Sequence, residues 1–170
     1  MDLEKAILTA IDFENKVRAV YADAARKSKD DTGKRIFEVL AKEEQTHVDF
    51  LTQKLAEWRE SGKVTPQKLA TVVPPGDTIK KGIKTLKQQV RDRPDRSHDL
   101  DLLKRALAVE SETGAFYKQM ASELDTQGRA LFQPFVEIEE GHYAIVQAEI
   151  DALSGLGFWF DFREFDLEAG

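Results

Sequence analysis

Cysteine is absent from this 170-residue chain, and its absence excludes several kinds of site. Without thiols the chain forms no disulfide framework, zinc ribbon, thiol nucleophile or cysteine-ligated iron site of its own. Long apolar runs are also missing, and the first residues, Met1-Asp2-Leu3-Glu4-Lys5, are acidic and amphipathic rather than a basic leader. We therefore expect a soluble cytoplasmic protein with no membrane contact.

The chain also has fewer basic than acidic residues. The chain has 25 Lys and Arg against 31 Asp and Glu, which gives a formal net charge of -6. No basic stripe interleaved with aromatic side chains stands out, so we expect no nucleic-acid partner. Most of the acidic side chains are predicted to lie on solvated helix surfaces, while a few buried carboxylates could be balanced by cations.

The β-branched alternation that is typical of strands is almost absent, and long stretches follow the helical period instead. The periodicity predicts an all-α chain with four long helices, at about 2–29, 34–60, 97–123 and 127–153. Pro134 falls inside the last of these and predicts either a kink or a delayed start. The length suits one domain with a sizeable core.

Residues 61–97 form a different kind of segment, basic and interrupted by prolines, with room for one short helix at about 77–91. Antiparallel neighbours need no such long link, whereas a chain that must travel the length of a helix bundle does. We therefore expect a bundle over 1–154 with a crossover at 61–97. The aromatic extension at 155–170 either packs across the bundle or fills a partner's groove, and an interface is slightly favoured.

One short motif, Glu-x-x-His, occurs twice and 95 positions apart, as Glu44 with His47 and as Glu139 with His142. Each copy follows a glutamate that has a tyrosine seven residues after it; these pairs are Glu14 with Tyr21 and Glu110 with Tyr117, at an offset of 96. Spacings of three, four and seven return to the same helix face. The two halves are therefore an internal repeat, and two helical hairpins with pseudo-two-fold symmetry are predicted.

The four motif glutamates each replace an apolar residue in the middle of an apolar stripe. Other glutamates fall outside the stripes and are predicted at the surface: Glu38, Glu43, Glu57, Glu137 and Glu140. Four buried carboxylates that face one another would destabilise the fold unless cations compensated them. Two histidines add nitrogen donors, which favour iron, manganese or zinc over magnesium or calcium. The sequence therefore predicts a dinuclear metal site.

Side chains around this site allow more than one interpretation. Tyr21 and Tyr117 lie one heptad from a motif glutamate, so each either donates a hydrogen bond to a metal-binding carboxylate on a facing helix or is a core tyrosine satisfied elsewhere. Glu149 is predicted to form a salt bridge near the end of the bundle. Glu112 points away from Glu110 on an ideal helix and is predicted to be at the surface.

These motifs give the chain a resemblance to rubrerythrin-type members of the ferritin-like diiron-carboxylate superfamily over residues 1–155. The resemblance implies a ferritin-like four-helix bundle that binds two iron ions, with manganese or zinc as substitutes. It implies that Glu44 and Glu139 bridge the ions and that Glu14 and Glu110 are terminal ligands. His47 and His142 would bind one ion each, and Tyr21 and Tyr117 would support the ligands.

Two features depart from that family. Classical members carry a four-cysteine rubredoxin module, which this chain lacks, so turnover would need an external electron donor such as a rubredoxin-like protein. They also have an additional carboxylate one turn after the third-helix ligand, where this chain has Thr113; Glu112 could replace it only if the helix were distorted. The second departure bears on peroxidase activity more than on metal binding.

Three functions follow as expectations. The first is a diiron oxidoreductase that uses its two-electron centre to reduce peroxide or dioxygen with electrons from an external donor. The second is iron binding, storage or sensing, ferroxidase-like but without catalytic turnover. The third is a scaffold whose metal is structural. A homo-oligomer, such as a dimer, is expected from the aromatic extension.

Overall fold

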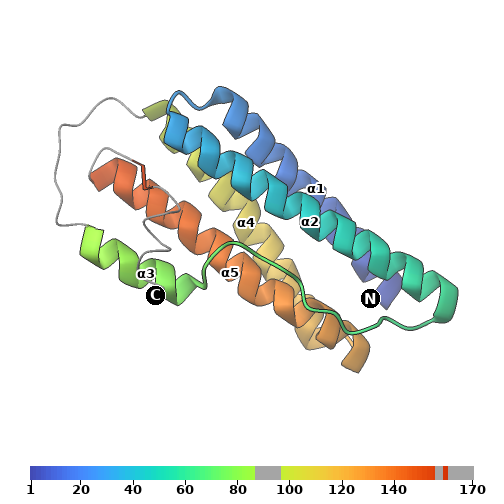
Figure 1. Cartoon of the computed structure of the whole chain (residues 1–170). Coiled ribbons are helices and arrows are strands. Elements are labelled where there is room, and N and C mark those ends of the chain that lie inside the picture. Colours follow the sequence, from blue (N-terminus) through green and yellow to red (C-terminus); the bar gives the residue numbers. More distant parts are fainter. Residues whose placement is uncertain (87–96, 156–158, 161–170) are drawn as a thin grey trace.

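The computed structural model describes residues 1–86, 97–155 and 159–160, and within these residues the all-α prediction is confirmed. The helices are α1 (Leu3–Lys27), α2 (Asp31–Ser61), α3 (Gly76–Leu86), α4 (Ser97–Glu123) and α5 (Thr126–Gly155). The four long helices lie side by side, with α1 packed on α2 and on α4, and α4 packed on α5 (Figure 1). The short α3 lies against α5. Within the described residues no helix is long and apolar enough to cross a membrane.

Helix ends follow local capping chemistry. The Asp2 carboxylate accepts a hydrogen bond from the backbone N–H of Lys5 at 2.9 Å and so begins α1. The Asp30 side chain accepts from the N–H groups of Thr32 and Gly33, so α2 begins at residue 31, three positions earlier than predicted. Gly62 ends α2 in the left-handed conformation (φ 67°), which only glycine adopts without strain.

The connection from α2 to α3 runs back along the molecule, as the length of the crossover predicted (Figure 1). It is fastened at its start, where the Lys54 ammonium donates to the carbonyl oxygen of Thr65 at 2.9 Å and the N–H of Val64 donates to Gln127 at 2.8 Å. The short helix predicted at 77–91 is α3, which runs to Leu86; residues 87–96 lie outside the described residues. The connection therefore brings α3 onto the α5 side of the molecule.

Pro134 lies inside α5, which begins eight residues earlier at Thr126. A delayed helix start at this proline, one of the two predicted alternatives, is therefore wrong.

The core consists of two apolar clusters with a polar layer between them. One cluster contains α1 residues 17–24 and the other contains α1 residues 3–10, and the other long helices divide in the same way. The boundary between the two clusters falls at Glu14 in α1, at 44–47 in α2, at Glu110 in α4 and at 139–142 in α5. The fold thus places the polar motif residues of four helices at one level in an apolar interior.

Two residues of the aromatic extension pack on the helices of their own chain. Trp159 and Phe160 are buried in the core, and the backbone N–H of Phe160 donates to the buried Glu149 carboxylate at 2.9 Å. For these two residues the interface prediction is wrong, because both are buried in the core of their own chain, where the Trp159 ring lies edge-on to Phe37. The rest of the extension, residues 156–158 and 161–170, lies outside the described residues.

Asp99 of α4 joins the turn after α1 and the aromatic extension through hydrogen bonds. Its buried carboxylate accepts hydrogen bonds from Ser28 Oγ, from the backbone N–H of Lys29 and from Trp159 Nε1, at 3.2–3.3 Å. Replacing Asp99 by alanine leaves these donors without their acceptor, so we expect a loss of about 2–3 kcal/mol in the free energy of unfolding. Urea denaturation measures it. Asp101→Ala, an exposed change two residues along, is the control, and equal losses in both variants would contradict the assignment.

Candidate metal centre

Six side chains predicted to be metal ligands meet in the polar layer. They are Glu14 from α1, Glu44 and His47 from α2, Glu110 from α4, and Glu139 and His142 from α5, and each is at most 1% exposed. The helical period explains the convergence, because each residue occupies a core position of its own helix. The structure brings all six together.

The ligand atoms of these six residues fall into two overlapping groups, and a third group joins both histidines to Glu43. In each group, one atom from every residue lies within 4.8 Å of the others. The first group is Glu14, Glu44, His47 and Glu139, and the second is Glu44, Glu110, Glu139 and His142. Glu44 and Glu139 belong to both groups, so these two carboxylates lie between two candidate metal positions that are each completed by one further glutamate and one histidine.

Both imidazoles turn their Nδ1 atoms toward the carboxylates. His47 Nδ1 lies 3.2 Å from Glu14 Oε2 and 3.1 Å from Glu44 Oε2. His142 Nδ1 lies 2.8 Å from Glu44 Oε1. The two rings are nearly parallel, with an interplanar angle of 8° and 5.5 Å between their centroids. The histidines thus repeat one arrangement on the two sides of Glu44.

Several buried polar atoms of this cluster make no hydrogen bond to the described residues: both carboxylate oxygens of Glu139, Glu110 Oε2 and the Nε2 atoms of His47 and His142. Buried polar atoms are nearly always satisfied in folded proteins, so the unsatisfied carboxylate oxygens gathered in this layer call for a further partner. Carboxylate oxygens with imidazole nitrogens suit iron, manganese or zinc. The donor set therefore fits a pair of divalent cations.

Burial makes ionisation of the carboxyl groups costly. It raises the pKa of Glu14 to about 8, and repulsion from Glu44 adds to the effect. Burial likewise raises the pKa of Glu139 well above its ordinary value, with repulsion from Glu14 and Glu44. Burial also raises the pKa of Glu110. Raised pKa values mean that these groups bind protons more tightly than free glutamates do, so protons compete with a cation for the same oxygens.

Glu44 and the two histidines titrate in the opposite sense to what burial alone would give. Burial opposes the charged form of Glu44, but attraction to His142 and hydrogen bonds lower its pKa well below the ordinary value. Burial also opposes charge on His47, yet attraction to Glu14 raises its pKa to about 10. The pKa of His142 is raised by attraction to Glu44 in the same way. The cluster thus holds positive charge on its histidines against the central carboxylate.

The two tyrosines bond across the molecule in a reciprocal pattern. The Tyr21 hydroxyl of α1 donates to Glu110 of α4, and the Tyr117 hydroxyl of α4 donates to Glu14 of α1. Both side chains are fully buried, and burial with the neighbouring carboxylates keeps the pKa of each hydroxyl well above its usual range. Of the two alternatives for these tyrosines, a hydrogen bond to a cluster carboxylate on a facing helix is what the structure has.

This symmetry predicts that Tyr21→Phe and Tyr117→Phe have matching effects. Each change leaves a buried carboxylate oxygen without its donor, so we expect each to lower the free energy of unfolding by about 1–3 kcal/mol. Chemical denaturation of both variants measures this. Tyr143→Phe changes a tyrosine that is 40% exposed and serves as the control. A loss in one variant with none in the other would contradict the reciprocal pattern.

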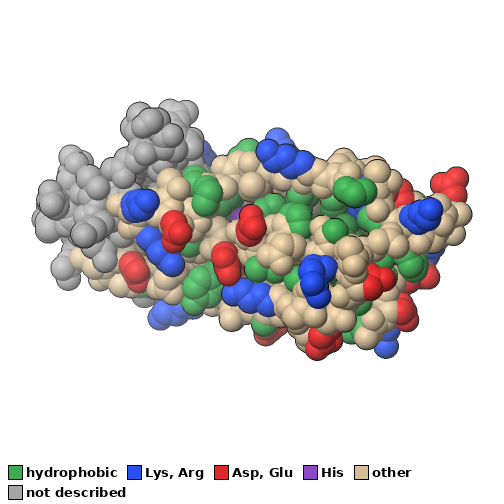
Figure 2. Space-filling view, turned by 90° about the horizontal axis from the view of Figure 1, so that it is seen from below, with side chains coloured by type: hydrophobic (Ala, Val, Ile, Leu, Met, Phe, Trp, Pro, Cys, Tyr) green, Lys and Arg blue, Asp and Glu red, His purple; other side chains and the backbone are tan. Residues whose placement is uncertain are grey.

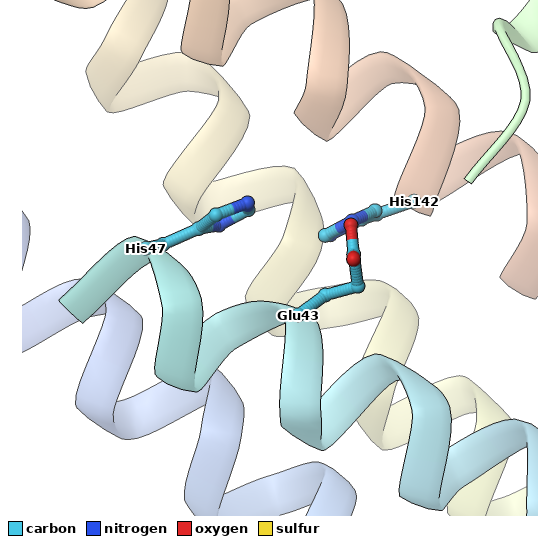
Figure 3. A group of neighbouring side chains, drawn as sticks. All are labelled: Glu43, His47 and His142. Carbon is cyan, nitrogen blue, oxygen red and sulfur yellow. The ribbon is translucent and has the colours of Figure 1, made fainter. Parts of the chain in front are cut away.

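Glu43 is the site residue that sequence reasoning missed. It was predicted at the surface, but its carboxylate is buried and its Oε2 lies 3.8 Å from His142 Nε2 (Figure 3). It accepts hydrogen bonds from the Thr71 hydroxyl and the Val72 N–H of the connection, which covers this face of α2. Helical period reports only the face that other helices cover, so no sequence signal marks a residue buried by a connection.

Other glutamates lie where they were predicted. Glu38, Glu137 and Glu140 are exposed, and Glu112 is an exposed partner of Lys16 in an ion pair. At the neighbouring position Thr113 is buried and donates its hydroxyl to the carbonyl oxygen of Val109 at 2.9 Å. Glu112 therefore adds no carboxylate to the cluster.

Comparisons of the chain with protein-family models, curated proteins and solved structures gave no match.

Proposed function

We propose that this protein is a dinuclear-iron protein, built on a ferritin-like four-helix bundle of the rubrerythrin type, that reduces peroxide or dioxygen with electrons from an external donor. The observation that carries the proposal is the sharing of Glu44 and Glu139 between two groups of ligand atoms. A single cation site would need only one such group. Shared carboxylates flanked by one glutamate and one histidine on each side suit a pair of ions.

Each residue of the cluster has a role in this proposal. Glu44 and Glu139 would be shared by the two ions, Glu14 with His47 would complete one position, and Glu110 with His142 the other. Manganese or zinc could occupy the same ligands. When bound, a pair of ferrous ions would supply two electrons, one from each ion, to an oxygen–oxygen bond.

The residues around the ligands would keep them in place and dry. Neutral hydroxyls of Tyr21 and Tyr117 hold one oxygen of Glu110 and of Glu14, which fixes how these carboxylates are turned. Glu43 Oε2 lies 3.8 Å from the outer nitrogen of His142, so its negative charge would favour a proton on that nitrogen and leave Nδ1 free for a cation. The apolar clusters above and below the layer exclude water from those two sides.

The proposal requires a separate source of electrons, because the chain has no cysteine and so no rubredoxin-type site. We propose a rubredoxin-like protein or a similar external donor in the cytoplasm, and a homodimer as the working form. The same observation favours a second candidate, in which the site binds or oxidises iron for storage, buffering or sensing without turnover. Thr113 supports this second candidate, since it takes the place of the additional carboxylate of classical rubrerythrins.

Stopped-flow absorbance tests the function directly. Protein loaded anaerobically with two Fe(II) per chain is mixed separately with hydrogen peroxide and with oxygenated buffer. The proposal predicts oxidation of the bound iron far faster than of free iron, and repeated cycles when a reductant is supplied. Faster reaction with oxygen, followed by iron release or accumulation, would support iron handling instead. Oxidation by neither oxidant faster than that of free iron would contradict both.

A further inference from the structure

A groove leads from the surface to two residues of the metal centre. It has a volume of about 860 Å³ and runs between α4 and α5, with the start of α3 along one side. Its lining includes Glu110 and Glu139, which are otherwise buried in the polar layer. A molecule in this groove would therefore lie against the ligands of the candidate metal positions.

Small residues keep the groove open beside these ligands. Gly114 and Ala115 of α4 face Ala144 and Ala148 of α5 across it. A Cβ atom added to Gly114 would meet only Glu139 Cβ, at 3.9 Å, so the space beside this glycine is a gap that larger side chains could fill. The groove is thus open because the side chains at these positions are small, and not only because of the distance between the helices.

The other half of the internal repeat is closed at the corresponding place. Gly114 corresponds to Arg18 of α1, and Glu140 corresponds to Gln45 of α2. Arg18 reaches across and donates a hydrogen bond to Gln45, and both side chains are half-buried. The repeat is therefore symmetric in its ligands and asymmetric in access, because the α4–α5 side has a glycine where the α1–α2 side has an arginine.

The size of the groove exceeds what hydrogen peroxide or dioxygen needs. Each of these is only about one to two water volumes of ~30 Å³, whereas clefts of roughly 300–1,000 Å³ hold organic ligands. Apolar surface from Pro75, Ala115, Tyr143, Ala144 and Ala148 lines it together with charged groups. This mixture suits an organic molecule with an apolar body.

Charge along the groove selects against anions. Acidic side chains outnumber lysines among its lining residues: Asp77, Glu137, Glu140 and Asp151 stand against Lys80 and Lys118, and Glu110 and Glu139 lie at its inner end. Lys118 is already paired with Glu140 at 3.0 Å. Figure 2 shows that acidic, basic and hydrophobic side chains are interspersed over the face of the molecule that it views. The groove therefore disfavours carboxylate or phosphate ligands and admits neutral ones.

We propose that the α4–α5 groove is the substrate site and that its substrate is an uncharged organic hydroperoxide. This inference rests on the proposed function. Reduction of such a hydroperoxide breaks its O–O bond, takes up two electrons and two protons, and yields an alcohol and water. When bound, a pair of ferrous ions would supply the two electrons, and the external one-electron donor would replace them. Gly114 and Ala115 determine specificity, since they set how large a molecule reaches Glu110 and Glu139.

Ligand binding tests the groove without relying on turnover. The neutral probe is cumyl alcohol, the product that cumene hydroperoxide would give, and the anionic probe of similar size is 4-isopropylbenzoate. Each is titrated into ¹⁵N-labelled protein with two equivalents of Zn²⁺, and amide shifts are followed by NMR. We expect cumyl alcohol to shift the amides of Gly114, Ala144 and Ala148, and to bind about tenfold more tightly than the anion.

A matched pair of variants separates a groove effect from a stability effect. Ala115→Leu fills the groove, while Ala19→Leu makes the same change at the corresponding exposed position of α1. We expect Ala115→Leu to weaken cumyl alcohol binding about tenfold and Ala19→Leu to change it less than about twofold. In iron-loaded protein, Ala115→Leu should slow oxidation by cumene hydroperoxide more than oxidation by hydrogen peroxide.

Three results would overturn the inference: no shift of the groove amides, equal or tighter binding of the anion, or equal weakening by both leucine variants. These results are distinct from failure of the proposed function. Failure of the function would appear as an absence of two-iron binding or of faster iron oxidation, whatever the probes do.

Discussion

Replacing Glu139 by glutamine is expected to change stability in opposite directions with and without metal. Glu139 belongs to both ligand groups, so its loss should abolish paired binding and weaken metal affinity at least about 100-fold. Wild-type protein should gain about 4 kcal/mol from a metal held at a thousandfold excess over its Kd, and the variant should gain no more than about 1.4 kcal/mol at the same metal concentration. Thermal and urea denaturation with and without Zn²⁺ measure this.

Without metal the same variant should be the more stable protein. Burial and repulsion from Glu14 and Glu44 raise the pKa of Glu139 well above its ordinary value, so folding makes the ionised form of this carboxyl costly. Glutamine has the same shape and needs no proton, and we expect a gain of about 1–3 kcal/mol in metal-free protein.

Glu140→Gln is the matched control, because it makes the same change one residue along at an exposed position of α5. It should leave both metal binding and metal-free stability close to those of the wild type. A Glu139→Gln protein that binds two metal ions with wild-type affinity would contradict the shared position of this carboxylate. A loss of stability in the metal-free variant would show that Glu139 is held by interactions other than cations.

The stabilisation that metal gives should increase steeply with pH between 6 and 8. In metal-free protein the pKa of Glu14 is raised to about 8 and that of His47 to about 10. A raised pKa means that the folded state binds protons more tightly than the unfolded state. The stability contributed by Glu14 is therefore complete below about pH 4.5 and is lost as pH rises to about 8, and that of His47 is lost between about 6.5 and 10.

Metal binding reverses this dependence, because cations bind the deprotonated carboxylate and the free imidazole nitrogen. With two protons displaced, the difference in unfolding free energy between metal-loaded and metal-free protein should grow by about 2.7 kcal/mol per pH unit. Paired denaturation curves at pH 6, 7 and 8 measure the difference. A metal-induced stabilisation that stays constant over this range would mean that Glu14 and His47 are not the groups that the metal displaces protons from.

Helical phase was enough to find the residues of the cluster. Glu14, Glu44, Glu110 and Glu139 were distinguishable from the other glutamates because each interrupts an apolar stripe, and helix packing then leaves them no direction but inward. The internal repeat also predicted that each half would supply one tyrosine. Helical phase could not predict which glutamate each tyrosine hydroxyl bonds to, because this depends on how the two helical hairpins pack against each other.

The misses have a common physical origin. Glu43 is buried by the connection at Thr71 and Val72, and Trp159 is fixed by Asp99 at the start of α4. Both contacts join a helix to a segment without regular structure, and such segments carry no period from which their docking can be predicted. The groove beside Gly114 was missed for a related reason. It exists because small residues of α4 and of α5 face one another, and the sequence alone does not show which residues of two helices lie opposite.

Anomalous X-ray diffraction at the iron edge, from crystals loaded anaerobically with Fe(II), tests directly whether the cluster holds two ions. We predict two anomalous peaks per chain, one among Glu14, Glu44, His47 and Glu139 and the other among Glu44, Glu110, Glu139 and His142. The two peaks would lie on either side of the shared carboxylates. A single peak, or iron bound only outside these two groups, would contradict the dinuclear centre.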